Sequence, residues 1–365
     1  MSDSEPDEDL LELLRKSLGL NGNEHAPPRI KVLEDAEYVY SNATDVAIDM
    51  RGTKDAATRI QNMMQEKGYS TRVWSLQELH PKAKDPSTVD FIFLMDLLNF
   101  SFWSSSLVPD EAYAVEYRGK TWGGYWSLVA AIQRALDDNI PITTPSFWDD
   151  EVACSDETLR NVFRSSTSEQ MPMLEERIHC LREAGKVLCN HFNGSFVNLL
   201  EEANGSAATV LDLLIKKLPC FDDAHYFEDQ TVRFDKRAQI LVADLWACFE
   251  GESYGFFSDI DQVTMFADYR IPQMLHTLGC ISYAPPLESH IRNLKPIENG
   301  HPWEIQLRGC SIWCVELIRR EILRDHPDRH INAILIDFFL YDTIKEMEAR
   351  GAEMIPHHRT RSIWY

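Results

Sequence analysis

Residues 303–323 read WEIQLRGCSIWCVELIRREIL, and this stretch decides the fold class. Its apolar residues recur at steps of three, four and seven, as on one face of a helix: Ile305, Ile312, Val315, Ile318 and Ile322. Two acid–base pairs follow the favourable i, i+4 order, Glu304 with Arg308 and Glu316 with Arg320. The stretch therefore predicts a long amphipathic helix.

The same periodicity recurs along the chain. It predicts further helices over residues 173–192, 207–218, 234–249 and 331–350, with Pro219, Gly251 and Gly351 at or just beyond the ends of the last three. Strand signals are few. Residues 72–76 are one weak candidate, and residues 113–117 and 121–125 flank the turn 118–120 as a hairpin. The sequence therefore predicts a mainly α fold with a minor β-hairpin element.

The charge balance excludes some partners. The chain has 365 residues, 44% of them apolar and 26% charged, which is ordinary globular usage. Lys and Arg number 36 against 58 Asp and Glu, a formal net charge of -22. Such an excess repels a nucleic-acid backbone and disfavours cationic docking on an anionic membrane. We therefore expect neither a nucleic-acid polymer nor a membrane as partner, although the charge balance leaves room for a local basic pocket. The sequence leaves the oligomeric state open.

The chain divides into a short arm and one large unit. Residues 1–28 form an acidic segment that ends at Pro27-Pro28, and we expect it to be mobile. Periodicity continues without a linker over residues 29–365, which predicts a single helical catalytic domain. No basic, apolar signal peptide is visible, and the longest apolar run, residues 91–103, is too short to span a membrane. We therefore expect a soluble protein of the cytoplasm, or of the cytoplasm and the nucleus.

Three acids lie inside aromatic-rich apolar runs: Asp96, Asp268 and Asp337. Burying a carboxylate is costly unless it is paired or hydrogen-bonded. Each acid alone could cap a helix or pair with an internal arginine. The three together predict a polar pocket.

Asp268 has the most informative surroundings. Pro272 suits the first turn of a helix over residues 271–278 that Gly279 would end, so Asp268 precedes a helix N-terminus. The partial positive charge there favours an ionised carboxylate, and Phe266 and Tyr269 could shield it from water. A shielded anion suits stabilisation of an oxocarbenium-like ribosyl cation, or its capture as a nucleophile.

The other candidates suggest recognition. Asp96 and Asn99 could read the N1–H/N2–H₂ edge of a guanine-like base, with aromatic faces against its plane, although an aromatic core segment is as good an interpretation. Lys236 and Arg237 open a predicted helix and could meet one phosphate, or lie in solvent. Residues 357–361, HHRTR, are a basic island that could contact an anion or lie on the plain surface. Two adjacent histidines do not share a helix face, so we predict no metal site.

Several of these stretches resemble the queuosine salvage protein family. They are residues 93–103, 117–126, 171–177, 236–244, 266–273, 308–319 and 358–361, and the resemblance covers about residues 35–365. It implies an N-glycosidase that hydrolyses queuosine 5′-phosphate and releases queuine for tRNA modification. It also implies a helical fold similar to the helix-hairpin-helix DNA glycosylases.

The resemblance assigns roles to residues. It points to Asp268 as the catalytic carboxylate, to Asp96, Asn99, Phe100 and Trp103 as base contacts, and to Lys236 at the ribose or phosphate. Phe266, Tyr269, Arg237 and Asp337 complete the candidate substrate-binding set. Queuine is a 7-deazaguanine without an N7 to protonate, so catalysis must act mainly on the sugar. We expect no cofactor, and water as second substrate. The alternatives are a queuine-binding carrier without catalysis and a nucleic-acid base-excision glycosylase.

Overall fold

The computed structural model describes residues 28–106 and 108–365. The acidic arm predicted for residues 1–28 therefore lies, except for Pro28, outside the described residues. The α-helices are α2 Val32–Asn42, α3 Met50–Lys67, α4 Arg72–Leu76, α5 Pro86–Leu97, α6 Tyr125–Asp137, α7 Pro145–Asp149, α8 Asp156–Val162, α9 Leu174–His191, α10 Phe196–Ala203, α11 Ala207–Lys217, α12 Lys236–Cys248, α13 Arg270–Thr277, α14 Pro285–Arg292, α15 Pro302–Asp325 and α16 Ala333–Ala349.

Strands form three separate antiparallel pairs. They are β1 (Val46–Ile48) with β6 (Ile281–Tyr283), β2 (Ala114–Tyr117) with β3 (Lys120–Gly123), and β4 (Ala224–Phe227) with β5 (Gln230–Arg233). The mainly α fold is confirmed, as is the hairpin of β2 and β3. The other two pairs are short and went unpredicted.

The strand predicted over residues 72–76 is wrong, because these residues form α4. Five residues are too few for periodicity to separate a strand from a helical turn. The segment begins with a turn in which Trp74 N–H donates to Thr71 O, and the helix packs against α12. No strand lies beside it to complete a ladder among the residues described.

Helix α15 is the long helix predicted from the opening stretch, and it packs against α2 and α3. At Gly309 it lies directly against Val39 of α2. A β-carbon built there would lie 2.5 Å from Val39 Cγ1, closer than side chains tolerate. A glycine in mid-helix costs about 1 kcal/mol in helix propensity, and here it allows the two helices to pack closely.

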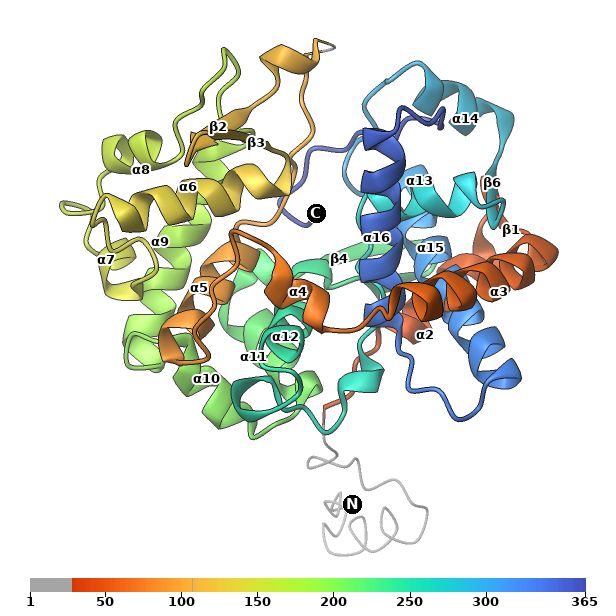
Figure 1. Cartoon of the computed structure of the whole chain (residues 1–365), viewed down its shortest axis with the longest axis horizontal. Helices are drawn as coiled ribbons and strands as arrows, with labels where there is room; N and C mark the ends of the chain where they lie inside the picture. The colour runs from red at the N-terminus through yellow and green to blue at the C-terminus, as the bar shows by residue number, and fades with distance from the viewer. Residues whose placement is uncertain (1–27, 107) are drawn as a thin grey trace, which may run out of the picture.

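The helices surround two large hydrophobic cores, beside a third, small cluster of Trp103, Tyr269 and Tyr365. The first is built mainly from α5, α6 and α9–α12, and the second from α2, α3 and α13–α16. Figure 1 shows these as two groups of helices with the C-terminal segment running between them. Met265 and Ala267 pack in the second core, whereas Phe266 between them packs in the first. The segment that leads to Asp268 therefore follows the boundary between the cores.

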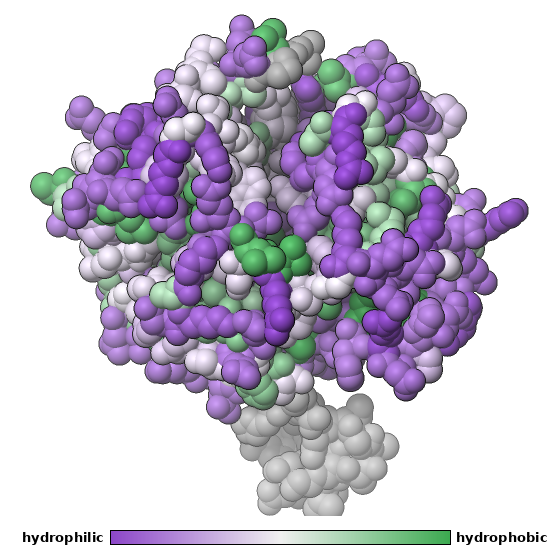
Figure 2. Space-filling view, in the orientation of Figure 1, coloured by the Kyte–Doolittle hydropathy of each residue, from purple (hydrophilic) through white to green (hydrophobic). Residues whose placement is uncertain are grey.

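The surface is mostly hydrophilic on the face shown in Figure 2. An apolar patch lies near its centre, at the place of α4 in Figure 1, where the Leu76 side chain is 80% exposed. Within residues 28–106 and 108–365, none of the helices has the length and apolar character needed to cross a membrane.

Candidate active site

Two adjoining cavities lie where the cores meet. The inner cavity has a volume of about 130 Å³ and the outer cavity about 700 Å³. Both are lined by Asn99, Tyr125, Trp126, Lys236, Asp268 and Tyr341. The inner cavity is otherwise lined mostly by rings and acids: Tyr69, Trp74, His80, Asp244, Phe266, Asp337, Phe338 and Asp342. Shared residues make the two cavities parts of one site.

Asp268 lies at the junction of the two cavities, just before α13. Its Oδ1 accepts from the backbone N–H groups of Arg270 at 2.8 Å and of Ile271 at 3.0 Å. This is the helix N-terminal position predicted from Pro272, with the helix beginning one residue earlier than expected. Phe266 lines the inner cavity and Tyr269 the outer one, so rings flank the carboxylate on both sides.

Burial and pairing act against each other at Asp268. Burial raises the pKa of its carboxyl above the ordinary value, whereas Lys236 and the two backbone N–H groups lower it. At Asp337, burial and the neighbouring Asp268 raise the pKa well above the usual range. Of these two acids, Asp268 therefore has the environment that better supports an anion.

Lys236 and Asn99 meet across the same junction. The Lys236 ammonium is buried and donates to the backbone oxygen of Asn99 at 3.2 Å. Asn99 Nδ2 donates in turn to Asp96 Oδ1 at 3.2 Å. Asp96 is fully buried, and burial raises its pKa to about 7. Its side chain is not part of either cavity wall, so it lies behind Asn99.

Phe100 and Trp103 line the outer cavity, and each ring is covered by a guanidinium. The Arg177 guanidinium carbon lies 4.2 Å from the centre of the Phe100 ring, and that of Arg361 lies 3.5 Å from the Trp103 ring. Arg237 also contacts Phe100, but it donates to the backbone oxygens of Leu97 and Cys220 and lines neither cavity. Arg237 is therefore a buried residue that holds the backbone behind the outer cavity, and it does not reach the cavity wall.

The outer cavity carries the basic groups. Besides Lys236, the cations at its wall are Arg270, Lys345 and Arg359, with His357 beside them. Arg270 pairs with Glu348, and Lys345 pairs with the same acid. Arg359 has no acidic partner among the residues described, and its guanidinium lies 5.5 Å from the Trp103 ring. The basic island predicted from the sequence thus supplies two residues to the cavity, His357 and Arg359.

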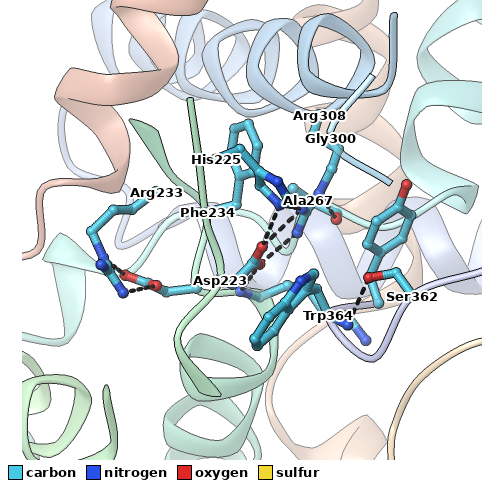
Figure 3. A network of polar contacts seen from close by, with 12 residues as sticks. Asp223, His225, Arg233, Phe234, Ala267, Gly300, Arg308, Ser362 and Trp364 are labelled. Carbon is cyan, nitrogen blue, oxygen red and sulfur yellow. Dashed lines mark hydrogen bonds and ion pairs between the residues drawn. The ribbon is translucent and has the colours of Figure 1, made fainter. Parts of the chain in front are cut away.

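A buried polar network lies behind the junction (Figure 3). Arg308 forms a bidentate pair with Asp223, at 2.9 and 2.6 Å, and its Nε donates to Ala267 O at 2.9 Å. The second oxygen of Asp223 also accepts from the Lys236 backbone N–H at 3.2 Å. The network therefore fixes the residue before Asp268 and the first residue of α12 together.

Comparison with known proteins shows the family of the chain. Residues 79–365 match the family model described as "Queuosine salvage protein". The chain belongs to the queuosine salvage protein family. A protein of Schizosaccharomyces pombe is 44% identical over 92% of this chain and 99% of its own length. One of Mus musculus is 40% identical, over 93% and 99%, and one of Sphaerobacter thermophilus 34%, over 92% and 98%. All three are named queuosine 5′-phosphate N-glycosylase/hydrolase.

In this member of the queuosine salvage family, sequence reasoning missed part of the inner cavity. Asp244 on α12 is an acid in the apolar run 240–249, the same signal that singled out Asp96, Asp268 and Asp337. Trp74 lies in α4, where a strand was expected, and His80 lies in the loop after α4. Their contribution depends on the long-range packing of α4 against α12, which local sequence does not show.

Proposed function

We propose that this chain hydrolyses the N-glycosidic bond of queuosine 5′-phosphate and releases queuine and ribose 5-phosphate. The observation that carries the proposal is the place of Asp268. Its carboxylate accepts hydrogen bonds from the N-terminus of α13, and it lines both the inner cavity, which is aromatic and acidic, and the wider outer cavity, which is basic. A nucleotide has the matching order, with a flat base, a sugar and an anionic phosphate.

The sugar is the part that Asp268 would stabilise. As the C1′–N bond breaks, its electron pair leaves with the base and positive charge develops on the ribosyl ring. A fixed carboxylate in a water-poor site stabilises that charge more strongly than water does. The incoming water supplies hydroxide to C1′ and a proton to the departing base, so the reaction balances without a cofactor. Asp337 is the next candidate for this role.

The base would enter the inner cavity and the phosphate the outer one. Rings such as Trp126 and Phe266 offer faces to a planar heterocycle. Asn99 would contact the base directly, with Asp96 orienting its amide from behind. Lys236 and the basic groups of the outer wall suit one phosphate. Phe100 and Trp103 would close the outer side, with Arg237 as a support.

A direct assay tests this proposal against its alternatives. Purified protein incubated with queuosine 5′-phosphate and water should release queuine, detected by mass spectrometry, in equal amount to ribose 5-phosphate. Binding without release, at high enzyme concentration, would favour the carrier and overturn the hydrolase. Tight, salt-sensitive binding to duplex DNA or RNA would favour the base-excision alternative.

The resemblance to helix-hairpin-helix DNA glycosylases belongs to this proposal, as does the assignment of residues 29–365 to one catalytic domain. A helical fold that presents a carboxylate near a helix N-terminus supports the first, and an inner cavity lined by residues of both hydrophobic cores supports the second. The net charge of -22 favours a free nucleotide over a nucleic-acid polymer as substrate.

A further inference from the structure

Charge is distributed unequally along the site. The outer wall gathers Arg270, Lys345 and Arg359. The inner wall holds four carboxylates, Asp244, Asp268, Asp337 and Asp342, and within the described residues its one Lys or Arg is Lys236, at the junction. His80, also on the inner wall, adds no positive charge near neutral pH, because burial lowers its pKa to about 4. The inner end of the site is therefore short of cations.

Three of the four inner acids already have hydrogen-bond donors. Asp268 accepts from two backbone N–H groups, Asp337 accepts from Phe266 N–H at 3.0 Å, and Asp342 accepts from the Tyr69 hydroxyl at 2.6 Å. Asp244 is 4% exposed, and the one side-chain donor beside its carboxylate is the neutral indole N–H of Trp74; no described lysine, arginine or histidine forms an ion pair with it. It is a buried acid without a charged partner on the wall of a cavity.

The surroundings of Asp244 suit a cationic ligand. The indole N–H of Trp74 is buried beside this carboxylate and lowers its pKa, but it falls short of good hydrogen-bond geometry and carries no charge. Rings on the same wall, among them Trp74, Tyr125 and Trp126, can stabilise a positive charge over their faces. A neutral donor would give Asp244 a hydrogen bond but leave the excess negative charge in place. A cation satisfies both needs. Burial and the neighbouring Asp96 also raise the pKa of Asp244 well above the ordinary range.

We infer that Asp244 binds an ammonium group carried by the base, and so makes the enzyme selective for 7-deazaguanine nucleotides with a cationic substituent. The inference rests on the proposed function. Queuine carries a cyclopentenediol on its seven-position through a methylene and a secondary amine, which is protonated at neutral pH. The substrate thus has an anion at one end and a cation at the other, in the same order as the basic and acidic walls.

Paired substrates test this role. Wild type and Asp244→Asn are compared on queuosine 5′-phosphate and on 7-deazaguanosine 5′-phosphate, which has the same ring edge and no amine. We expect wild type to favour queuosine 5′-phosphate in kcat/KM by about 10- to 100-fold, and Asp244→Asn to lose most of this ratio through KM. The ratio is unaffected by any unfolded fraction. Asp212→Asn, an equal charge change in a surface pair on α11, should keep the wild-type ratio.

The outcomes separate the inference from the proposed function. If Asp244→Asn slows both substrates equally, Asp244 serves the shared ring edge and the inference is overturned. If wild type releases neither base, the proposed function fails. In that case titration calorimetry still tests the ammonium-binding role of Asp244. Wild type should bind queuine more tightly than 7-deazaguanine, and Asp244→Asn should bind the two bases with equal affinity. Equal affinities in wild type would overturn the inference on this arm too.

Discussion

Two regions of the molecule bury aspartates in opposite ways. In the network of Figure 3, Asp223 lies against the Arg308 guanidinium, His225 and a backbone N–H, and its pKa is held well below the usual range by Arg308 and His225. In the inner cavity, Asp244 has no ion-pair partner among the described residues, only the neutral indole N–H of Trp74 beside it, and burial raises its pKa. Removing one partner of a fully paired buried acid is strongly destabilising, because the other charge is left buried and uncompensated. A buried acid without a charged partner costs stability and is available to a ligand.

The largest effect is expected on the free energy of unfolding, when the buried pair of Asp223 with Arg308 is broken. Asp223→Ala leaves the Arg308 guanidinium buried without its main counter-charge, and we expect the free energy of unfolding to fall by about 3–5 kcal/mol in urea denaturation. The exposed pair of Arg292 with Glu288, at 2.6 Å, provides the control, because Glu288→Ala should cost at most about 1 kcal/mol. Equal losses in the two variants would contradict the contrast.

Asp268→Asn should have the next largest effect, on turnover. The amide keeps the shape of the side chain but removes the negative charge that faces the sugar. We expect kcat on queuosine 5′-phosphate to fall by about 10²- to 10³-fold, with queuine affinity and melting temperature near wild type. Near-normal turnover would move the catalytic role to Asp337.

Lys236→Met should change the pH dependence. The proposed mechanism needs Asp268 ionised, so kcat/KM falls as the pH drops through the pKa of this group. Lys236 lowers that pKa, and its removal should shift the acidic limb to higher pH by about one unit. Lys216→Met, on the surface of α11, is the control. An unmoved acidic limb in Lys236→Met would separate Lys236 from the ionisation of Asp268.

Arg359→Met tests the basic wall. Its guanidinium lines the outer cavity without an acidic partner among the described residues, so a phosphate is its natural counter-charge. We expect KM for queuosine 5′-phosphate to rise by about ten-fold, and KM for the unphosphorylated nucleoside to stay unchanged. A similar rise for both substrates would assign Arg359 to the shape of the cavity.

The smallest effect is expected for Asp244→Asn on stability. An acid whose folded-state pKa is raised loses stabilising free energy as the pH rises from the unfolded pKa through the folded one. The amide does not titrate, so we expect the variant to match wild type in acid and exceed it by about 0.5–1 kcal/mol at neutral pH. A loss of stability at neutral pH would show that Asp244 is already paired in the free protein.

The sequence predicts elements well where a long amphipathic face repeats, as in α9, α11, α15 and α16. It fails where a segment is short, as in α4, because five residues fit two periodicities. It also placed Asp268 before a helix, because Pro272 and Gly279 mark the ends of α13 locally. It could not distinguish Asp244 from Asp96, since both are acids in apolar runs and only tertiary packing decides which one reaches the cavity.

The residues just before Asp268 alternate between the two hydrophobic cores, with Phe266 in one and its neighbours Met265 and Ala267 in the other. Proteins open region by region under mild denaturation, each region with its own free energy. The position of Asp268 depends on both regions, so opening of the weaker one is enough to displace it. As denaturant is added, the enzyme should therefore lose activity before the circular dichroism signal of its helices falls. Enzymatic activity then reports local opening of the less stable of the two core regions.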